Sequence, residues 1–549
     1  MSVKPLFILI LLTAAFGARA QRNAPSNDTV LKGSTIEVIQ AYTPKVKQSP
    51  KPEWVPQLPP VDTNHPAISF DVPQQTLYYS YNSLPLSPLV LGKPPLELPF
   101  PNYIKAGGGN MSTIFLDAGI GGIYGKGYET AIHLHHFSQK GNITNQQSSL
   151  SGIEAEGTFH RTKSDIHAVI MGERNQYNYY GYNHSYHNYS EDTVNQVYGT
   201  IRGIIDLKKN ADSNGSKFFY HPAINASVYM GKPNTSETSI GINAPFSYMI
   251  DSAVDIQIAL RGQLTNFTND TQSINNSYAG AWPGFSLHGV HAAGHALLGL
   301  AMGKDGDGYL LPDLLGQYKA DGNKYIISAG WQATLRQNTY EEMTRENPYM
   351  LNIYAVQQTR RDEVFGQFQG RGGDHFTFSG RVSWWSMMGL PVFLNDAGDQ
   401  SRFYVVYQDV KAISFKAAAR YTKANRWSVG GSADFYSFYN ISSQYIGVDQ
   451  YVWHEPAMRI KGDFSINPIP KLTCNAYMTI LGGIHARDTA LNVINLPTAI
   501  DMGLSAEYQI VPRLSVFAQI NNLLNNKYQR WYGYEAYGLN IYGGLRLKF

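Results

Sequence analysis

Two groups of histidines offer the most obvious chemistry in the chain. They are His133, His135 and His136 in the first group and His288, His291 and His295 in the second. On an extended strand His133 and His135 share one face with Glu129. A metal site needs three or four converging ligands and further residues that orient them. The spacing favours polar side chains on a strand face, so we expect neither a metal nor a cofactor.

The sequence shows no known catalytic motif. There is no G-x-S-x-G nucleophile elbow, no H-E-x-x-H zinc motif, no C-x-x-C pair and no phosphate-binding P-loop. The single cysteine, Cys474, excludes an intrachain disulfide. These observations favour a protein that is not an enzyme.

A nearly uncharged segment rich in Tyr, Asn and His spans residues 174–196. Tyrosine rings offer stacking faces and amides offer hydrogen bonds, a mixture that suits sugars or other polar ligands. An ordinary solvated loop has the same composition, so both interpretations stand. The candidate residues of an external ligand loop are Tyr179, Tyr180, Tyr182, His184, Tyr186 and Tyr189.

The overall composition favours a β protein. The 549 residues include 44 Lys and Arg against 41 Asp and Glu, so 15% of the chain is charged and the formal net charge is +3. Soluble domains are usually about 25% charged. Gly (51) and Tyr (38) are abundant instead. This balance argues against a disordered acidic chain and against a protein that binds nucleic acid.

Apolar and polar residues alternate over most of residues 103–549, as in strands with one apolar and one polar face. In Val254–Leu264, for example, Ile256 and Ile258 lie on one face and Gln257 lies on the other. Repeats of about ten such residues are typical of strands that cross an outer membrane. We therefore predict an all-β fold, a single large transmembrane antiparallel β-barrel of about 16–22 strands.

Both ends of the sequence fit export to the cell outer membrane. Residues 1–20 are predicted to be a signal peptide, cleaved between Ala20 and Gln21. The last strand is predicted to place the apolar residues from Tyr537 to Phe549 on one face. Its end fits the β-signal that the barrel assembly machinery recognises. The residues of this signal are Tyr542, Gly544, Leu547 and Phe549.

Residues 21–102 differ from the rest because they hold 15 of the 28 prolines. Proline cannot donate a backbone hydrogen bond in a central strand, so we predict an extended periplasmic arm here. Residues 34–42 lack proline and are rich in β-branched side chains. They could add as a strand to a protein partner, or they could be a linker. The candidate partner-binding residues are Thr35, Ile36, Val38, Ile39 and Tyr42.

The late part of the chain resembles the TonB-dependent receptors of Gram-negative bacteria. In Val516–Tyr528 a strand is followed by Asn522-Leu523-Leu524-Asn525, which is similar to the turn before the last strand of those receptors. Tyr451–Pro456 is similar to another segment of their late barrel. The resemblance implies an outer-membrane transport barrel. The receptors carry a large plug domain before the barrel, whereas this chain has only the proline-rich arm, so we expect a relative without a plug.

Two functions fit this architecture. The first is a transport conduit or gated pore, a receptor for a nutrient or polymer. The second is a structural or assembly subunit of an outer-membrane complex, docked through the arm. Such a barrel has a lumen too wide for its own side chains to fill, so the arm, inward-folded loops or a partner must occlude it. We expect contacts with outer-membrane lipid, the assembly machinery and a periplasmic or outer-membrane protein.

Overall fold

The computed structural model describes residues 102–549, apart from 211–214, 233, 323, 352, 354, 424–425, 446 and 489. The expected cleavage site at Ala20 and Gln21, the proline-rich arm and its candidate strand at residues 34–42 lie outside the described residues. Strands dominate the described part of the chain, and helix occurs there only in short connecting segments. None of these helices is long and apolar enough to cross a membrane.

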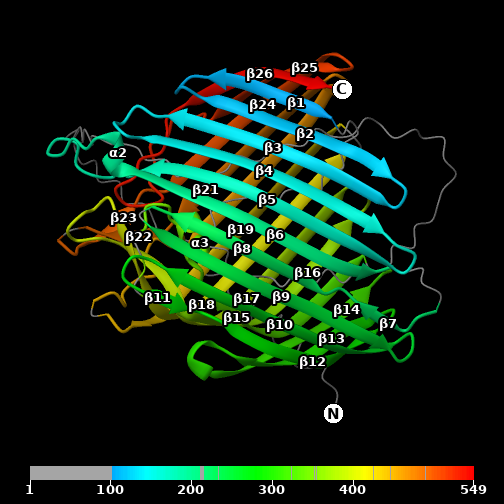
Figure 1. Ribbon diagram of the computed structural model, residues 1–549. Helices are drawn as coiled ribbons and strands as arrows, with labels where there is room; N and C mark the ends of the chain where they lie inside the picture. Colours follow the sequence, from blue (N-terminus) through cyan, green and yellow to red (C-terminus); the bar gives the residue numbers. More distant parts are fainter. Residues whose placement is uncertain are drawn as a thin grey trace, which may run out of the picture. The chain divides into compact units, whose positions relative to one another are not determined.

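One antiparallel sheet forms the wall of the molecule and closes on itself (Figure 1). In the described residues the wall has 22 strands, the upper end of the predicted range. The first strand pairs with the last, so that Ile104 lies opposite Leu547 and Ala106 opposite Leu545. Closure leaves no strand edge unpaired, which a barrel in lipid requires. The predicted antiparallel β-barrel is confirmed.

Successive wall strands run in opposite directions. They are β1 (Tyr103–Gly109), β2 (Ile114–Gly125), β3 (Tyr128–Lys140), β4 (Gln147–His160), β5 (Ser164–Asn178), β6 (Asn195–Lys209), β8 (Ala223–Gly231), β9 (Thr235–Met249), β10 (Val254–Thr268), β12 (Tyr278–His288), β13 (Ala292–Met302), β14 (Gly308–Ala320), β15 (Tyr325–Gln337), β16 (Gln358–Gly372), β17 (Phe376–Asn395), β18 (Phe403–Lys423), β19 (Trp427–Ser443), β20 (Met458–Ile469), β21 (Leu472–Gly482), β24 (Ala499–Val511), β25 (Leu514–Asn521) and β26 (Asn540–Lys548). The connections carry β7 (Phe218–Tyr220), β11 (Ser273–Asn275), β22 (Ile484–Arg487), β23 (Val493–Leu496), α2 (Glu191–Val194), η2 (Lys304–Gly306) and α3 (Tyr340–Glu346).

The two ends of the barrel have different connections. Most turns at one end are tight, such as residues 470–471 between β20 and β21. The other end carries long connections, which include residues 179–194, 338–357, 483–498 and 522–539. Outer-membrane barrels have short periplasmic turns and longer extracellular loops. The long connections are therefore assigned to the extracellular end.

Apolar side chains face outward, as the alternation predicts. In β10 the outward residues Ile256, Ile258 and Leu264 are exposed, at 54%, 43% and 61%. Gln257 faces inward and donates a hydrogen bond to Ser286 Oγ on β12 at 2.7 Å. Because lipid covers the outer face of such a barrel, these exposed apolar residues form its membrane belt.

The face predicted for the last strand is correct only within the strand itself. Leu545, Leu547 and Phe549 are exposed on the outer face. The extension of that face to Tyr537 is wrong, because β26 begins at Asn540 and Tyr537 lies in the preceding connection. Tyr537 is buried, and its hydroxyl bonds to Ser148 Oγ at 3.0 Å.

Candidate functional site

The predicted polar face of β3 is found on the inside of the barrel. His133 Nε2 lies 3.0 Å from Asp117 Oδ2 on β2, and the ring of His135 stacks on that of His133. His295 on β13 pairs in the same way with Asp313 on β14, at 3.0 Å. No group of three or more His, Cys, Asp or Glu side chains in the described residues could hold a metal ion. His133 and His295 are thus partners of wall carboxylates.

Three extracellular connections from different parts of the wall meet each other. Residues 179–194 follow β5, residues 338–357 follow β15, and residues 522–539 follow β25. These strands are spaced widely around the closed sheet, so contacts among the three connections must reach across the lumen. We call these three connections the mouth closure.

Stacked tyrosines form the centre of the mouth closure. The rings of Tyr349 and Tyr534 are 3.5 Å apart at an interplanar angle of 15°, and the ring of Tyr180 packs edge-on against both. Tyr180 donates a hydrogen bond to the Glu535 carbonyl at 2.8 Å. Burial raises the pKa of Tyr349 and Tyr534 well above the ordinary value of 10.0, so both rings stay uncharged. One tyrosine from each connection thus contributes to a single aromatic contact.

A larger apolar cluster surrounds these rings. Its other buried members are Tyr179, Tyr182, Val194, Tyr198, Tyr229, Phe267, Tyr340, Met343, Met350, Ile353, Val356, Phe393, Phe403 and Trp531. Wall residues such as Tyr229 and Phe267 therefore pack against residues of the connections. Burial of large aromatic side chains is the main source of stability that such a cluster offers.

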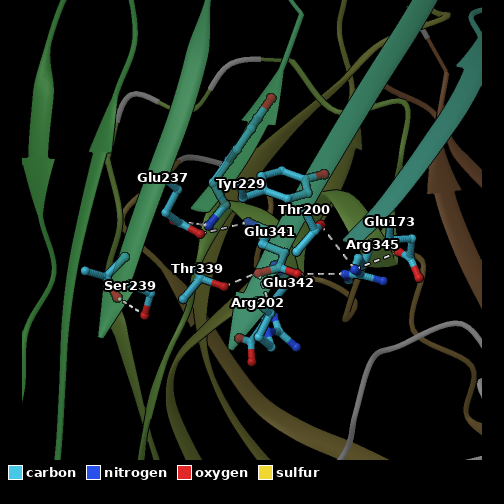
Figure 2. Close-up of polar contacts among 12 residues, drawn as sticks. Glu173, Thr200, Arg202, Tyr229, Glu237, Ser239, Thr339, Glu341, Glu342 and Arg345 are labelled. Carbon is cyan, nitrogen blue, oxygen red and sulfur yellow. Dashed lines mark hydrogen bonds and ion pairs between the residues drawn. The ribbon is translucent and has the colours of Figure 1, made fainter. Parts of the chain in front are cut away.

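Helix α3 anchors residues 338–357 to the far wall. Thr339 caps the helix, because its Oγ1 accepts the Glu342 amide at 3.1 Å. The carboxylate of Glu237 on β9 accepts the backbone amides of Tyr340 and Glu341, at 2.6 and 3.1 Å (Figure 2). Glu237 is 3% exposed. The first turn of a helix leaves amides without an intrahelical acceptor, and a wall carboxylate fills that need here.

Ion pairs extend this anchor to β5 and β6. Arg345 of α3 lies 2.7 Å from Glu173 Oε1 on β5 and 3.0 Å from Glu341 Oε1 (Figure 2). Glu341 also accepts from Arg202 on β6 at 2.7 Å. Burial alone would lower the pKa of Arg345, but the charges of Glu173 and Glu341 outweigh it and hold the pKa above the ordinary value. A segment that leaves β15 is thus bound by polar contacts to β5, β6 and β9.

A buried histidine joins a further connection to the mouth closure. His454 lies in residues 444–457, and its Nδ1 donates to the Phe393 carbonyl on β17 at 2.8 Å. Its Nε2 accepts the Tyr532 amide at 3.3 Å. Burial lowers the pKa of His454 to about 3, so the ring is neutral at physiological pH. The ring also packs against Phe403 and Trp531.

The residues of the candidate ligand loop fall into a buried group and an exposed group. The interpretation as an open stacking surface is wrong for Tyr179, Tyr180 and Tyr182, because all three rings are buried in the mouth closure. His184, Tyr186 and Tyr189 are exposed, and Tyr186 is 82% exposed. The segment therefore has a buried base and an exposed tip. Ligand binding by the tip stays a prediction.

The turn that resembles those of the TonB-dependent receptors leads into the mouth closure. Asn522 and Asn525 have positive φ angles of 46° and 49°, which asparagine tolerates better than most residues. Asn522 Nδ2 donates to the Asn526 and Tyr537 carbonyls, at 2.8 and 2.9 Å. These bonds fix the start and end of the connection that carries Trp531 and Tyr534. Residues Trp453, His454 and Glu455 of the second resembling segment are buried.

Sequence reasoning missed residues 338–357 altogether. The segment carries one clear local signal, Thr339 followed by Glu342, which is the pattern of a capping box at a helix start. That signal predicts a helix but gives no indication of where the helix docks. Its partners Glu237, Arg202 and Glu173 are far away in the sequence.

Comparisons with known proteins bear on the fold. No protein-family profile matches the chain, and no curated protein matches it. Among solved structures, the FrpB iron transporter from Neisseria meningitidis (F3-3 variant) matches with a TM-score of 0.65 and 11% identity, over 83% of this chain and 82% of that one. The ferric-catecholate import receptor Fiu from K12 E. coli matches at 0.61 and 9%, over 82% and 81%. P. aeruginosa FpvA bound to a pyoverdine matches at 0.60 and 10%, over 82% and 72%.

The chain has the barrel fold of TonB-dependent receptors. The fold and the apolar membrane belt place the protein in the cell outer membrane.

Proposed function

We propose that this protein is a gated transport barrel, a receptor-like conduit for a nutrient, whose resting state is sealed by the mouth closure. The contact of Tyr180, Tyr349 and Tyr534 across the lumen carries this proposal. The neighbours in fold support it, since FrpB is an iron transporter and Fiu is a ferric-catecholate import receptor. Cargo then passes only when the closure opens.

The proposal assigns the moving part to residues 338–357. Asn338 Nδ2 donates to the Gln357 carbonyl at 2.7 Å and to Thr359 Oγ1 at 2.8 Å, so the two ends of the segment are held together. A segment pinned at adjacent strands can leave the lumen as a unit without breaking the β15–β16 ladder. The contacts that must break include the polar ones to Glu237, Arg202 and Glu173. The apolar packing of Tyr340, Met343 and Tyr349 in the buried cluster must be lost as well.

The proposal also includes the absence of a separate plug domain. The barrel's own connections would do the sealing that a plug does in TonB-dependent receptors. The proline-rich arm would then be available to bind a periplasmic protein through Thr35, Ile36, Val38, Ile39 and Tyr42.

A reversible cross-link tests the transport proposal without knowledge of the cargo. Cysteines replace Tyr349 and Tyr534 in a Cys474→Ser background, and a disulfide or short bis-maleimide locks the closure. The growth defect is first measured in cells that lack the protein. We expect cells with the disulfide-locked protein to show the same growth defect. Normal growth should return when the disulfide is reduced. The matched control has cysteines in place of Tyr186 and Tyr189 on the exposed tip. It should restore growth to cells that lack the protein, both before and after oxidation.

The second candidate is a structural or assembly subunit, and the dense packing of the mouth closure favours it. A barrel that never opens can still hold partners through its arm. In that case the locked protein complements the deletion fully, and the transport proposal fails.

A further inference from the structure

The periplasmic end of the barrel carries an excess of exposed basic side chains. We define the periplasmic rim as the periplasmic turns together with the two residues at each adjoining strand end. In the described residues the rim has 11 exposed Lys and Arg side chains against four exposed carboxylates, those of Glu129, Asp251, Asp321 and Asp374. The basic residues are Lys126, Arg161, Lys163, Lys208, Lys217, Lys324, Arg371, Lys423, Arg426, Lys471 and Arg513.

The extracellular end has the opposite balance. By the same definition, its described residues include three exposed basic side chains, which belong to Lys140, Lys232 and Lys527. Six exposed carboxylates accompany them, on Glu191, Asp192, Asp270, Asp307, Glu342 and Asp449. The excess of positive charge therefore belongs to the periplasmic rim and is not a general property of the surface.

A girdle of exposed aromatic rings shows the depth at which the basic residues lie. Its members at the periplasmic strand ends include Tyr128, Phe159, Phe218, Tyr248, Tyr318, Phe368, Phe376, Tyr508 and Phe549. Such rings mark the boundary between lipid tails and headgroups. Lys126 and Arg161 lie two residues beyond Tyr128 and Phe159, toward the periplasm. Lys324 Nζ stands over the ring of Tyr325 at 5.4 Å. The basic side chains thus reach the level of the headgroup phosphates.

We propose that the periplasmic rim binds the anionic headgroups of phospholipids in the periplasmic leaflet. The basic residues follow the wall from the β2–β3 turn to the β24–β25 turn, so they surround the barrel instead of forming one face for a protein. A leaflet is the partner that contacts all of these turns at once. Ammonium and guanidinium groups pair with lipid phosphates, and their long aliphatic stems lie along the aromatic girdle.

One arc of the rim has few basic side chains. The turns at residues 250–253 and 289–291 contain Asp251 and no Lys or Arg. Val290 in the second turn is highly exposed. Lys217 Nζ donates to the Ile250 carbonyl at 2.8 Å, so a basic side chain from the β6–β8 connection does reach the first of these turns. The proposal therefore leaves out the β12–β13 turn and covers the remainder of the circumference.

The test measures which lipids surround the intact protein. The full chain is reconstituted in phosphatidylcholine vesicles that contain spin-labelled phosphatidylglycerol or spin-labelled phosphatidylcholine, and the fraction of immobilised label gives the relative association constant. We expect phosphatidylglycerol to associate severalfold more strongly at low salt and the two lipids to become equal at high salt, since exposed charges are screened within about 10 Å at 0.1 M.

Two triple variants localise the effect. Lys423→Gln, Lys471→Gln and Arg513→Gln remove exposed rim charges for which the structure shows no ion pair. This variant should lose much of the phosphatidylglycerol preference. Lys140→Gln, Lys232→Gln and Lys527→Gln remove the same charge at the other end and should leave the preference unchanged. Gel mobility before and after heating confirms that both variants fold.

Equal association of the two lipids with the wild-type protein overturns the proposal, as does equal loss in both variants. Salt-sensitive binding of polyglutamate to the protein in a zwitterionic detergent, without any phosphatidylglycerol preference, would instead assign the rim to an acidic protein partner. None of these outcomes depends on whether the barrel transports a nutrient.

Discussion

Glu237 is the residue that fixes the crossing segment most closely to the wall. Its two carboxylate oxygens accept the amides of Tyr340 and Glu341 in a site that excludes water. In Glu237→Gln the amide oxygen can accept one of these bonds, while the amide nitrogen faces a second donor. One buried amide is then left unpaired, at a cost of about 1–3 kcal/mol.

We therefore expect faster hydrogen exchange at the amides of Tyr340 and Glu341 in Glu237→Gln. Glu342→Gln changes an exposed carboxylate on the same helix and is the matched control. Its exchange rates should equal those of the wild type. Unchanged exchange in both variants would show that Glu237 does not hold the segment.

His454 gives the mouth closure a dependence on pH. Burial lowers its pKa from 6.5 to about 3, and the nearby charge of Arg530 acts in the same direction. When the closure opens, the ring regains its ordinary pKa, so the open state binds more protons between pH 6.5 and 3. The contribution of His454 is therefore complete above pH 6.5 and is lost progressively as the pH falls through this window.

The expected result is that acidification lowers the protection factor of the Tyr532 amide, whose N–H donates to His454 Nε2. The protection factor is the intrinsic exchange rate at each pH divided by the observed rate, so it removes the pH dependence of the exchange chemistry itself. In His454→Gln the Tyr532 amide should have a lower protection factor at neutral pH, and that factor should depend less on pH. Other groups titrate in the same window, so the comparison between the two proteins is the readout. An identical pH dependence in both would rule out His454 as the cause.

At the scale of elements, the seam between β1 and β26 depends on glycines. A Cβ on Gly544 would overlap the carbonyl oxygen of Ala106, and a Cβ on Gly107 would overlap that of Gly543. The two strands that close the barrel thus approach more closely than side chains allow. Gly544 also belongs to the assembly signal expected from the sequence, which stays a prediction.

Gly544→Ala should destabilise the seam by about 1–3 kcal/mol, the usual cost of overpacking. Gly380→Ala is the matched control, because no atom lies within 4 Å of its added Cβ. The measurement is the folded fraction by heat-modifiable gel mobility during refolding into lipid. Equal folded fractions would mean that the seam tolerates a side chain at this position.

The strands could be predicted from sequence and the mouth closure could not. The alternation in β10 predicts the outward face because apolar Ile256 and Ile258 face lipid, whereas polar Gln257 faces the lumen. Tyr180, Tyr349 and Tyr534 meet through contacts between distant connections, which leave no local period. Tyr179 and Tyr180 are buried and donate hydrogen bonds to backbone carbonyls. A buried segment of this kind is as rich in tyrosine as a solvated loop, so composition alone could not predict that Tyr179, Tyr180 and Tyr182 are buried.

At the scale of the whole molecule, the mouth closure crosses a lumen that the wall side chains are too short to fill. A barrel of 22 strands is too wide to be filled by its wall side chains. Three connections that leave the wall far apart meet at Tyr180, Tyr349 and Tyr534. We propose that the closure is the barrier to permeation within the described residues, and contacts to β5, β6 and β9 anchor its residues 338–357.

Replacement of that segment is straightforward because its ends are already paired. Gln337 and Gln358 face each other at the end of the β15–β16 ladder, so a two-residue Asn-Gly turn can replace residues 338–357. A barrel whose exposed tip at residues 184–188 is replaced by Gly-Gly serves as the control, since that tip lies outside the buried cluster.

Single-channel conductance in planar bilayers tests the central claim most directly. The wild type and the tip variant should be silent or open only briefly, whereas the variant without residues 338–357 should show large, long-lived conductance steps. A variant that stays as silent as the wild type, or a wild type that conducts as freely as the variant, would contradict the account.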